Sequence, residues 1–332
     1  MTYLVLRFST LGNVAMTVPV IASVSALQPD DEFIVVAKKR LSAMYYGLPN
    51  VRFHEAELTD LGSLIRLYRE LKQYSIDAVI DLQNVARTRL LRALFRLGGK
   101  RTYRIRYGRV SKYLITLCGF NFGKALPTEF ERYADTFRRA GLRCDTRFEA
   151  LAVNEEAQRA VYERFGEKQG RWIGIAPFAK SKSNMLSYRT TKEVIERLSA
   201  EPNTRLFLFG AGKIECEMLR QWASVFPHTD SIAGELPLEQ ELELMRRLDG
   251  MVCMDSANQH LSSLVGLRAI SVWCGTHPKL GFAGWKQRPE DIIQLNQIAC
   301  RPCTCHGINY CRYHNFACKN ISVEQIIKRI YE

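Results

Sequence analysis

Residues 3–20 read YLVLRFSTLGNVAMTVPV, and they pass from a β-type apolar run through a polar turn into an apolar run of helical character. Further apolar runs at 33–37 and 78–81 are separated by helical patterns. Short apolar strands that alternate with helices are typical of a parallel, doubly wound sheet. The first half of the chain is therefore predicted to be an α/β domain, with a ligand-binding edge at the turn 9–13.

The same alternation starts again in the second half of the chain. Strands are expected at 172–177, 206–209, 251–254 and 269–273. The polar segment 154–171 is the expected boundary between the halves. The sequence thus predicts an N-terminal domain over 1–160, a C-terminal domain over 170–320 and a C-terminal helix over 321–332.

Length and composition suit a globular protein. The chain has 332 residues, of which 47% are hydrophobic and 24% are charged, and this is ordinary for two globular domains. No apolar run approaches the roughly 20 residues that a membrane-spanning helix needs. The N-terminus lacks the basic start, apolar stretch and cleavage site of a signal peptide. We therefore expect a cytoplasmic protein.

Positive charge gathers in one part of the chain. The formal net charge is +13, and no acidic residue stands between Asp81 and Glu129. The basic residues of this interval are Arg87, Arg89, Arg92, Arg96, Lys100, Arg101, Arg104, Arg106, Arg109, Lys112 and Lys124. We expect the arginines from Arg89 to Arg109 to form a solvent-facing patch. Such a patch attracts phosphate groups of lipid, substrate or nucleic acid, and charge alone does not choose among them.

Three predicted strand-to-helix turns carry groups that suit a phosphorylated ligand. The first is the turn 9–13, STLGN. In the second, 254–261 (MDSANQHL), Asp255 stands at a strand tip and the N–H groups of a helix N-terminus follow it, an arrangement that holds a diphosphate. The third, 176–184 (APFAKSKSN), offers Lys180 and Lys182. Each turn also has a plainer interpretation: an ordinary βα turn, an Asp/Ser helix cap and a solvated lysine loop.

Together these segments resemble the heptosyltransferases of glycosyltransferase family nine. Residues 6–19, LRFSTLGNVAMTVP, are similar to the family's opening L-R-x-S-x-x-G-D-V-x-x-T-x-P. Residues 255–260, DSANQH, are similar to its D-S/T-G/A-x-x-H segment, and residues 273–278, WCGTHP, to its F-G-x-T-x-P segment. The similarity spans both halves of the chain in the same order.

The resemblance implies a GT-B fold, in which two Rossmann-like domains face each other across a cleft with Gly12 opposite Asp255. It implies an inverting, metal-independent transfer of heptose, or a related sugar, from ADP-heptose to the lipopolysaccharide core. The expected partners are this donor, an anionic glycolipid acceptor and the inner face of the cytoplasmic membrane; no nucleic acid and no required cofactor are expected. The donor side is expected at Lys180, Lys182, Gly210, Gly212, Glu215, Asp255, Ser256, Ala257 and His260. The acceptor side is expected at Ser9, Thr10, Gly12, Arg104 and Arg106.

Two positions depart from the family pattern. Asn13 stands where the family has the aspartate proposed to deprotonate the acceptor hydroxyl, and an amide is not a useful base. The family's K-x-W/Y-P segment reads NMLS at 184–187, so its lysine is missing unless Lys180 or Lys182 replaces it. A sugar-nucleotide-binding protein without turnover is therefore the alternative to a working transferase.

Five cysteines near the C-terminus are candidate ligands of a structural zinc ion. They are Cys300, Cys303, Cys305, Cys311 and Cys318. Four thiolates suffice for a tetrahedral zinc site, but this spacing matches no standard zinc finger, and free thiols are the alternative.

Two other classes of function are disfavoured. A nucleic-acid-binding protein is suggested by charge alone, and the chain contains no recognisable nucleic-acid-binding module. An NAD-dependent enzyme is disfavoured because the turn 9–13 lacks the G-x-G-x-x-G fingerprint.

Overall fold

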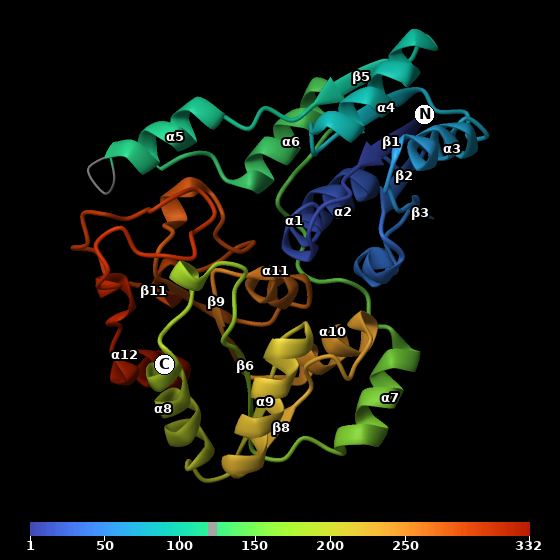
Figure 1. Ribbon diagram of the computed structural model, residues 1–332. Coiled ribbons are helices and arrows are strands. Elements are labelled where there is room, and N and C mark those ends of the chain that lie inside the picture. The colour runs from blue at the N-terminus through green and yellow to red at the C-terminus, as the bar shows by residue number, and fades with distance from the viewer. Residues whose placement is uncertain (119–124) are drawn as a thin grey trace. The chain divides into compact units, whose positions relative to one another are not determined.

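The computed structural model describes residues 1–118 and 125–332, and its contacts divide the chain into two compact units (Figure 1). The first unit comprises Met1–Tyr107 and Glu129–Val153, and the second comprises Gly108–Thr128 and Asn154–Glu332. Each unit is built on one parallel β-sheet with flanking helices. The predicted α/β class with two doubly wound sheets is confirmed. Residues 108–128 group with the second unit, whereas the sequence placed them in the N-terminal domain.

The first unit carries a five-stranded sheet with the order β3-β2-β1-β4-β5, and all its neighbouring strands are parallel. Its strands are β1 (Thr2–Leu6), β2 (Glu32–Ala37), β3 (Val51–Glu55), β4 (Ala78–Asp81) and β5 (Arg101–Arg104). Its helices are α1 (Leu11–Ala15), α2 (Val18–Leu27), the 3-10 helix η1 (Lys39–Tyr45), α3 (Leu61–Leu71), α4 (Ala86–Leu97) and α6 (Glu129–Arg139). The order reverses between β1 and β4, and ligands of doubly wound sheets bind outside the carboxyl ends of the strands at such a point.

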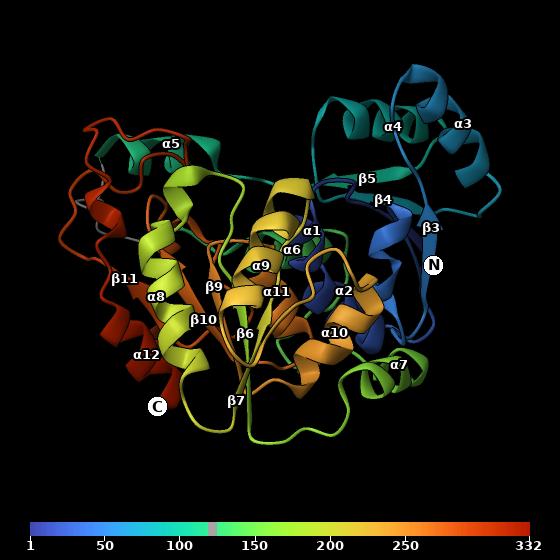
Figure 2. The same cartoon turned by 60° about the horizontal axis from the view of Figure 1, so that its bottom comes forward.

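Both faces of this sheet are covered by helices. Side chains alternate between the faces of a strand, and Leu4 and Leu6 of β1 pack in one cluster with Leu91 and Phe95 of α4. Figure 2 shows α3 and α4 on one side of the sheet and α2 on the other. The apolar runs that predicted the strands are therefore continuous, because the strands are buried on both faces.

Helix α4 buries a different face from the one that the leucine spacing predicts. In the sequence, the spacing of Leu90, Leu91, Leu94 and Leu97 predicts that these four side chains share one apolar face. Leu97 is 86% exposed and Leu90 is 41% exposed, whereas Leu91 and Phe95 are buried. Residues four apart lie on the same side of a helix, so the large ring of Phe95 extends the buried stripe from Leu91.

The second unit carries a six-stranded parallel sheet with the order β11-β10-β9-β6-β7-β8. Its strands are β6 (Arg171–Ala176), β7 (Thr204–Leu208), β8 (Thr229–Ser231), β9 (Gly250–Met254), β10 (Ala269–Trp273) and β11 (Ile292–Gln294). Its α-helices are α5 (Arg109–Cys118), α7 (Glu155–Phe165), α8 (Tyr188–Ser199), α9 (Lys213–Val225), α10 (Leu238–Arg247), α11 (Ala257–Leu264) and α12 (Val323–Tyr331). Its 3-10 helices include η3 (Lys182–Asn184), η4 (Pro278–Leu280), η5 (Pro289–Asp291) and η6 (Ala317–Lys319). Counted from β6, this is the strand order of a six-stranded Rossmann sheet, and the order reverses between β6 and β9.

The terminal helix α12 is an integral part of the second unit. It lies beside α8 (Figures 1 and 2), and Val323 and Ile326 join the hydrophobic core. Arg329 binds the buried Asp291 at 2.9 Å, and Arg268 binds the same carboxylate at 2.6 Å. None of the helices in the described residues has the length and apolar character needed to cross a membrane.

Candidate functional site

The carboxyl end of β1 leads into the motif that the sequence singled out. Thr10 is the N-cap of α1, and Asn13 lies within the first turn of this helix rather than at its cap. The Asn13 side chain donates from Nδ2 to Thr10 Oγ1 at 2.9 Å. The Ser9 hydroxyl oxygen is buried without a hydrogen-bond partner among the described residues. Ser9, Thr10, Gly12 and Asn13 therefore stand together at the carboxyl edge of the first sheet.

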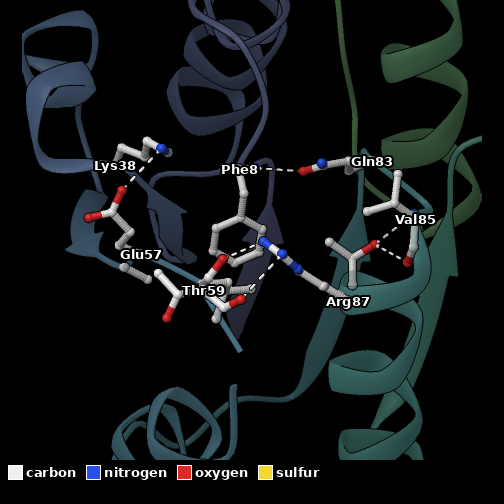
Figure 3. A pocket seen from close by; sticks show the side chains of 10 residues that line it. Phe8, Lys38, Glu57, Thr59, Gln83, Val85 and Arg87 are labelled. Carbon is white, nitrogen blue, oxygen red and sulfur yellow. Dashed lines mark hydrogen bonds and ion pairs between the residues drawn. The ribbon is translucent and has the colours of Figure 1, made fainter. Parts of the chain in front are cut away.

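A cavity of about 400 Å³ opens at the same edge of the first unit (Figure 3). Its wall is formed by residues that follow four strands, among them Phe8, Lys38, Glu57 and Gln83. Lys38 pairs with Glu57 at 3.1 Å, and the Phe8 amide donates to Gln83 Oε1 at 2.7 Å. Arg87 closes the wall by donating to the carbonyl oxygens of the β3–α3 loop. Lys38 and Glu57 were not predicted as site residues, although each follows a strand.

Two buried charges hold the strand ends of this edge in place. The Arg7 guanidinium is 3% exposed and donates to the Leu82 carbonyl at 2.6 Å and to the Tyr107 hydroxyl at 2.5 Å, which links the end of β1 to that of β4. The Asp81 carboxylate is fully buried and binds Arg92 at 2.8 Å. It also accepts the backbone N–H groups of residues 83 and 84. Both charged groups therefore bind partners inside the protein and hold the ends of β1 and β4 in place.

In the second unit, Asp255 follows β9 and stands at the reversal point of the sheet. Its Oδ2 accepts Thr276 Oγ1 at 2.5 Å and Asn184 Nδ2 at 3.2 Å. Among the described residues, its Oδ1 receives a single long contact of 3.4 Å, from Gln259 Nε2. Withdrawal from water raises the pKa of Asp255 to about 6, and the Thr276 hydrogen bond opposes this shift. One oxygen of the carboxylate thus has two hydrogen-bond donors, and the other has a single long contact.

Helix α11 begins beside this carboxylate. Ser256 is its N-cap, but its side chain makes no capping hydrogen bond, and the Ser256 hydroxyl has no partner among the described residues. Ser256 thus occupies the position of the predicted Asp/Ser cap without capping the helix through its side chain. Free N–H groups at a helix N-terminus attract an anion. Ala257 begins the helix, and His260 is buried in it. Burial lowers the pKa of His260 to about 3, so its ring is neutral at pH 7.

Two loops complete this edge of the second sheet. The loop after β6 carries Lys180 and Lys182, which are exposed and form no ion pair with any described residue. The loop after β7 carries Gly210 and Gly212, and a Cβ at Gly210 would approach Leu219 Cδ1 to 2.7 Å. Gly212 has a φ of +86°, a conformation that favours glycine. The Ala211 N–H donates to Glu215 at 3.0 Å, and partial burial raises the pKa of this carboxyl above its usual range.

Comparison with known proteins identifies the family. The model of glycosyltransferase family 9 (heptosyltransferase) matches residues 64–311. The chain belongs to glycosyltransferase family 9. Comparison with curated protein sequences found no match.

Solved structures share the fold of this family 9 glycosyltransferase at low sequence identity. ADP-heptose lps heptosyltransferase II of E. coli has a TM-score of 0.73 at 18% identity, with 100% of this chain and 99% of that chain covered. The family 9 glycosyl transferase from Veillonella parvula DSM 2008 has a TM-score of 0.75 at 15% identity, covering 99% and 96%. E. coli heptosyltransferase WaaC with ADP has a TM-score of 0.68 at 16% identity, covering 99% and 100%. The expected GT-B fold is therefore confirmed.

The structure of this family 9 glycosyltransferase brings some predicted site residues together. On the second sheet, Asp255, Ser256 and Ala257 adjoin Asn184, the residue that stands where the family has a lysine. Thr276, which donates to Asp255, was not predicted as a site residue, although it lies in the family-like segment 273–278. The predicted position of Gly12 opposite Asp255 stays a prediction.

The basic interval of this glycosyltransferase is divided between the two units. Arg89, Arg96, Arg101, Arg104 and Arg106 have exposed side chains in the first unit. Arg92 was expected in the solvent-facing patch, and this is wrong, because it lies largely buried against Asp81. Lys112 is buried in the second unit, with its Nζ 4.2 Å from the centre of the Phe282 ring. The Arg109 side chain and Lys124 lie outside the described residues.

The cysteine-rich segment of the enzyme lies against the loops after β6 and β10. Cys303 N donates to the Gly275 carbonyl at 2.8 Å, and Cys303 and Cys318 are buried. Cys300, Cys305 and Cys311 are partly exposed, and all five are free thiols. Among residues 1–118 and 125–332, no three His, Cys, Asp or Glu side chains are arranged to hold a metal ion. A structural zinc at these cysteines stays a prediction.

Proposed function

We propose that this glycosyltransferase transfers a heptose, or a closely related sugar, from ADP-heptose to the core of lipopolysaccharide with inversion. The single observation that carries the proposal is the position of Asp255, whose Oδ2 is held by two donors and whose Oδ1 has one long contact, beside the N-terminus of α11, where the Ser256 side chain makes no capping bond. E. coli WaaC has been solved with ADP and with ADP-2-deoxy-2-fluoro heptose, which supports an ADP-linked donor.

In this proposal, each group on the donor side binds a different part of the nucleotide-sugar. Asp255 Oδ1 accepts a hydroxyl of the donor sugar. The N–H groups from Ser256 onwards bind the diphosphate at the positive end of the α11 dipole. As the bond from the sugar to the phosphate breaks, positive charge develops on the sugar ring and negative charge on the departing diphosphate. Lys180 and Lys182 neutralise that negative charge from the loop after β6.

The loop after β7 recognises the nucleotide in this proposal. Gly210 and Gly212 let the backbone approach the base closely, because neither carries a side chain in the way. Glu215 is held against this loop by the Ala211 N–H. His260 stays neutral and supports α11 from within the core.

The acceptor side lies at the α1 edge of the first sheet in this proposal. Ser9, Thr10 and Gly12 line the path of the acceptor hydroxyl, and Asn13 orients it. Arg104 and Arg106 offer positive charge to an anionic glycolipid. A sugar-nucleotide-binding protein without turnover is the second candidate, favoured by the amide at Asn13.

A nucleotide panel tests the donor class. We expect ADP, and not UDP, GDP or CDP, to raise the melting temperature of the protein, because a ligand that binds only the folded state stabilises it. Differential scanning fluorimetry at equal nucleotide concentrations measures this. Stabilisation by another nucleotide alone would contradict the ADP-linked donor, whether or not the enzyme turns over.

Transfer in this proposal needs no metal ion. We expect dialysis against EDTA to leave the rate of nucleotide release unchanged, since Lys180, Lys182 and the α11 N-terminus supply the positive charge. A rate that falls on chelation and returns with Mg²⁺ would contradict this. Thermal melting of the dialysed protein also tests for a structural zinc ion at the five C-terminal cysteines. Such an ion contributes to folding stability, so its removal lowers the melting temperature.

We propose that the enzyme works as a peripheral protein on the inner face of the cytoplasmic membrane. Arg96→Glu with Arg101→Glu should weaken binding to vesicles of anionic lipid by tenfold or more, since each basic residue near such a surface contributes about 1 kcal/mol. Arg189→Glu with Arg220→Glu, exposed in the second unit, is the matched control. Sedimentation with vesicles at low salt measures both, and equal binding of the two variants would argue against this surface.

A further inference from the structure

The Asp255 carboxylate is held from both sides of its strand. In the sheet order β10-β9-β6, Asp255 follows the middle strand. Thr276 reaches its Oδ2 from the β10 side, and Asn184 reaches the same oxygen from the β6 side. Two donors on one oxygen fix the rotation of the carboxylate and point the other oxygen away from both. Asn184 is only 4% exposed, so its amide acts inside the protein rather than on the surface.

Asn184 is itself held by a segment far along the chain. Four hydrogen bonds join the loop after β6 to the segment 303–309. Ser183 and Ile308 form two of them, from Ser183 N to Ile308 O and from Ile308 N to Ser183 Oγ, each at 2.9 Å. The other two run from Ser181 Oγ to His306 O at 3.2 Å and from Lys182 N to Asn309 Oδ1 at 3.0 Å. Ser183 Oγ also donates to Asn184 Oδ1 at 3.0 Å, which leaves Nδ2 directed at Asp255. The orientation of the Asn184 amide is thereby set by its neighbours.

Gly307 makes this arrangement possible. Its backbone has a φ of +82°, and a Cβ built on it would lie 2.2 Å from Asn184 Oδ1. Real side chains do not approach so closely, so any other residue at this position must push the Asn184 amide or the segment aside. The Thr304 hydroxyl fixes the same turn by donating to the Gly307 carbonyl at 3.0 Å.

We propose that Asn184 is a positioning residue of the donor site, because its hydrogen bond orients Asp255 toward the donor sugar. The segment 303–309 belongs to the same site, since it holds Asn184 in place. The inference rests on the proposed function, since it takes the sugar of a nucleotide-sugar as the ligand of Asp255. Asn184 does not touch the sugar; it acts through the carboxylate.

Calorimetric titration with ADP and with ADP-heptose tests the proposal, because only the second ligand carries the sugar. In the native protein we expect ADP-heptose to bind more tightly than ADP. Asn184→Asp and Asn184→Ser should each reduce this preference about tenfold, as expected for the loss of hydrogen bonds to a charged group. Gly307→Ala should reduce it as well. The affinity for ADP should change less than about twofold in all three variants.

Tyr310→Phe is the matched control, because Tyr310 adjoins the segment, is 63% exposed and makes no hydrogen bond to a described residue. It should keep the native preference, and thermal melts should show that every variant titrated is folded. If Asn184→Asp does not fold, the serine and Gly307 variants decide the question. Equal losses of ADP and ADP-heptose affinity would mean a purely structural role and overturn the proposal, as would an unchanged preference. A native protein that binds ADP-heptose no better than ADP would instead contradict the proposed function and the inference with it.

Discussion

Asn13→Asp should raise the rate of sugar transfer by about 10²- to 10⁴-fold, the usual contribution of a general base. Asn13 Nδ2 now donates to Thr10 Oγ1 at 2.9 Å. A hydroxyl both donates and accepts, so Thr10 can donate to an aspartate oxygen in the same place. The new carboxylate would therefore keep the orientation of the amide and gain the ability to take the acceptor proton. Release of ADP with a matched donor and acceptor measures the rate.

Asn203→Asp is a suitable control for this variant, because it makes the same change in charge. Asn203 is exposed just before the amino end of β7, at the edge of the second sheet opposite to the carboxyl ends of its strands. Its rate should equal that of the native enzyme. A native enzyme that is already fast and is slowed by Asn13→Asp would show that Asn13 orients the acceptor hydroxyl while another group takes the proton. Orientation alone supplies several kcal/mol of a barrier, so this second outcome is physically sound.

Asp255→Asn should lower the affinity for ADP-heptose about tenfold to a hundredfold and leave the affinity for ADP nearly unchanged. An amide has the shape of the carboxylate but not its charge, and hydrogen bonds to a charged group contribute about 1.5–3 kcal/mol. Calorimetric titration with the two ligands separates the sugar contact from the nucleotide contacts. Equal losses for ADP and ADP-heptose would mean that Asp255 supports the loop rather than the sugar.

The same contact should depend on pH. Binding of ADP-heptose to the native protein should weaken as the pH falls through about 6, where Asp255 takes up a proton. Three neighbouring groups do not titrate in this window: burial lowers the pKa of His260 to about 3, raises that of the Cys274 thiol to about 12, and also raises the pKa of Cys253. Asp255→Asn should therefore abolish the pH dependence. Retention of the dependence in that variant would assign it to another group.

Folding stability should respond to this group in the opposite direction. The pKa of Asp255 is higher in the folded chain than its ordinary value of 3.8, so the folded state binds the proton more tightly. The stability that this proton confers is present below about pH 4 and is lost as the pH rises through about 6. At neutral pH the ionised, buried Asp255 carboxylate therefore lowers the folding stability. The hydrogen bonds from Thr276 and Asn184 favour the ionised form and reduce this loss of stability.

Much of the site follows from local sequence because parallel strands all end at one edge of a sheet. Ser9 to Asn13 come after one apolar run and Asp255 after another, so their places at the two sheet edges can be inferred without coordinates. Strand β3 (Val51–Glu55) was not foreseen, because Arg52 and His54 interrupt its apolar pattern at the edge of the sheet. Propensity is weak evidence for such half-buried strands.

Periodicity and short motifs are local properties of a chain, so the two doubly wound sheets, the family resemblance and the strand tips that carry Asp255 and Asn13 could be inferred without coordinates. Which charged and polar groups stay exposed, and which bind partners inside the protein, follows from packing instead. Arg92 was predicted to belong to an exposed basic patch, but in the structure it binds Asp81. Asn184 stands where the family has a lysine, and in the structure its amide donates to Asp255. The physical reason is the same in both cases: a buried polar group needs a partner, and packing brings that partner from elsewhere in the chain.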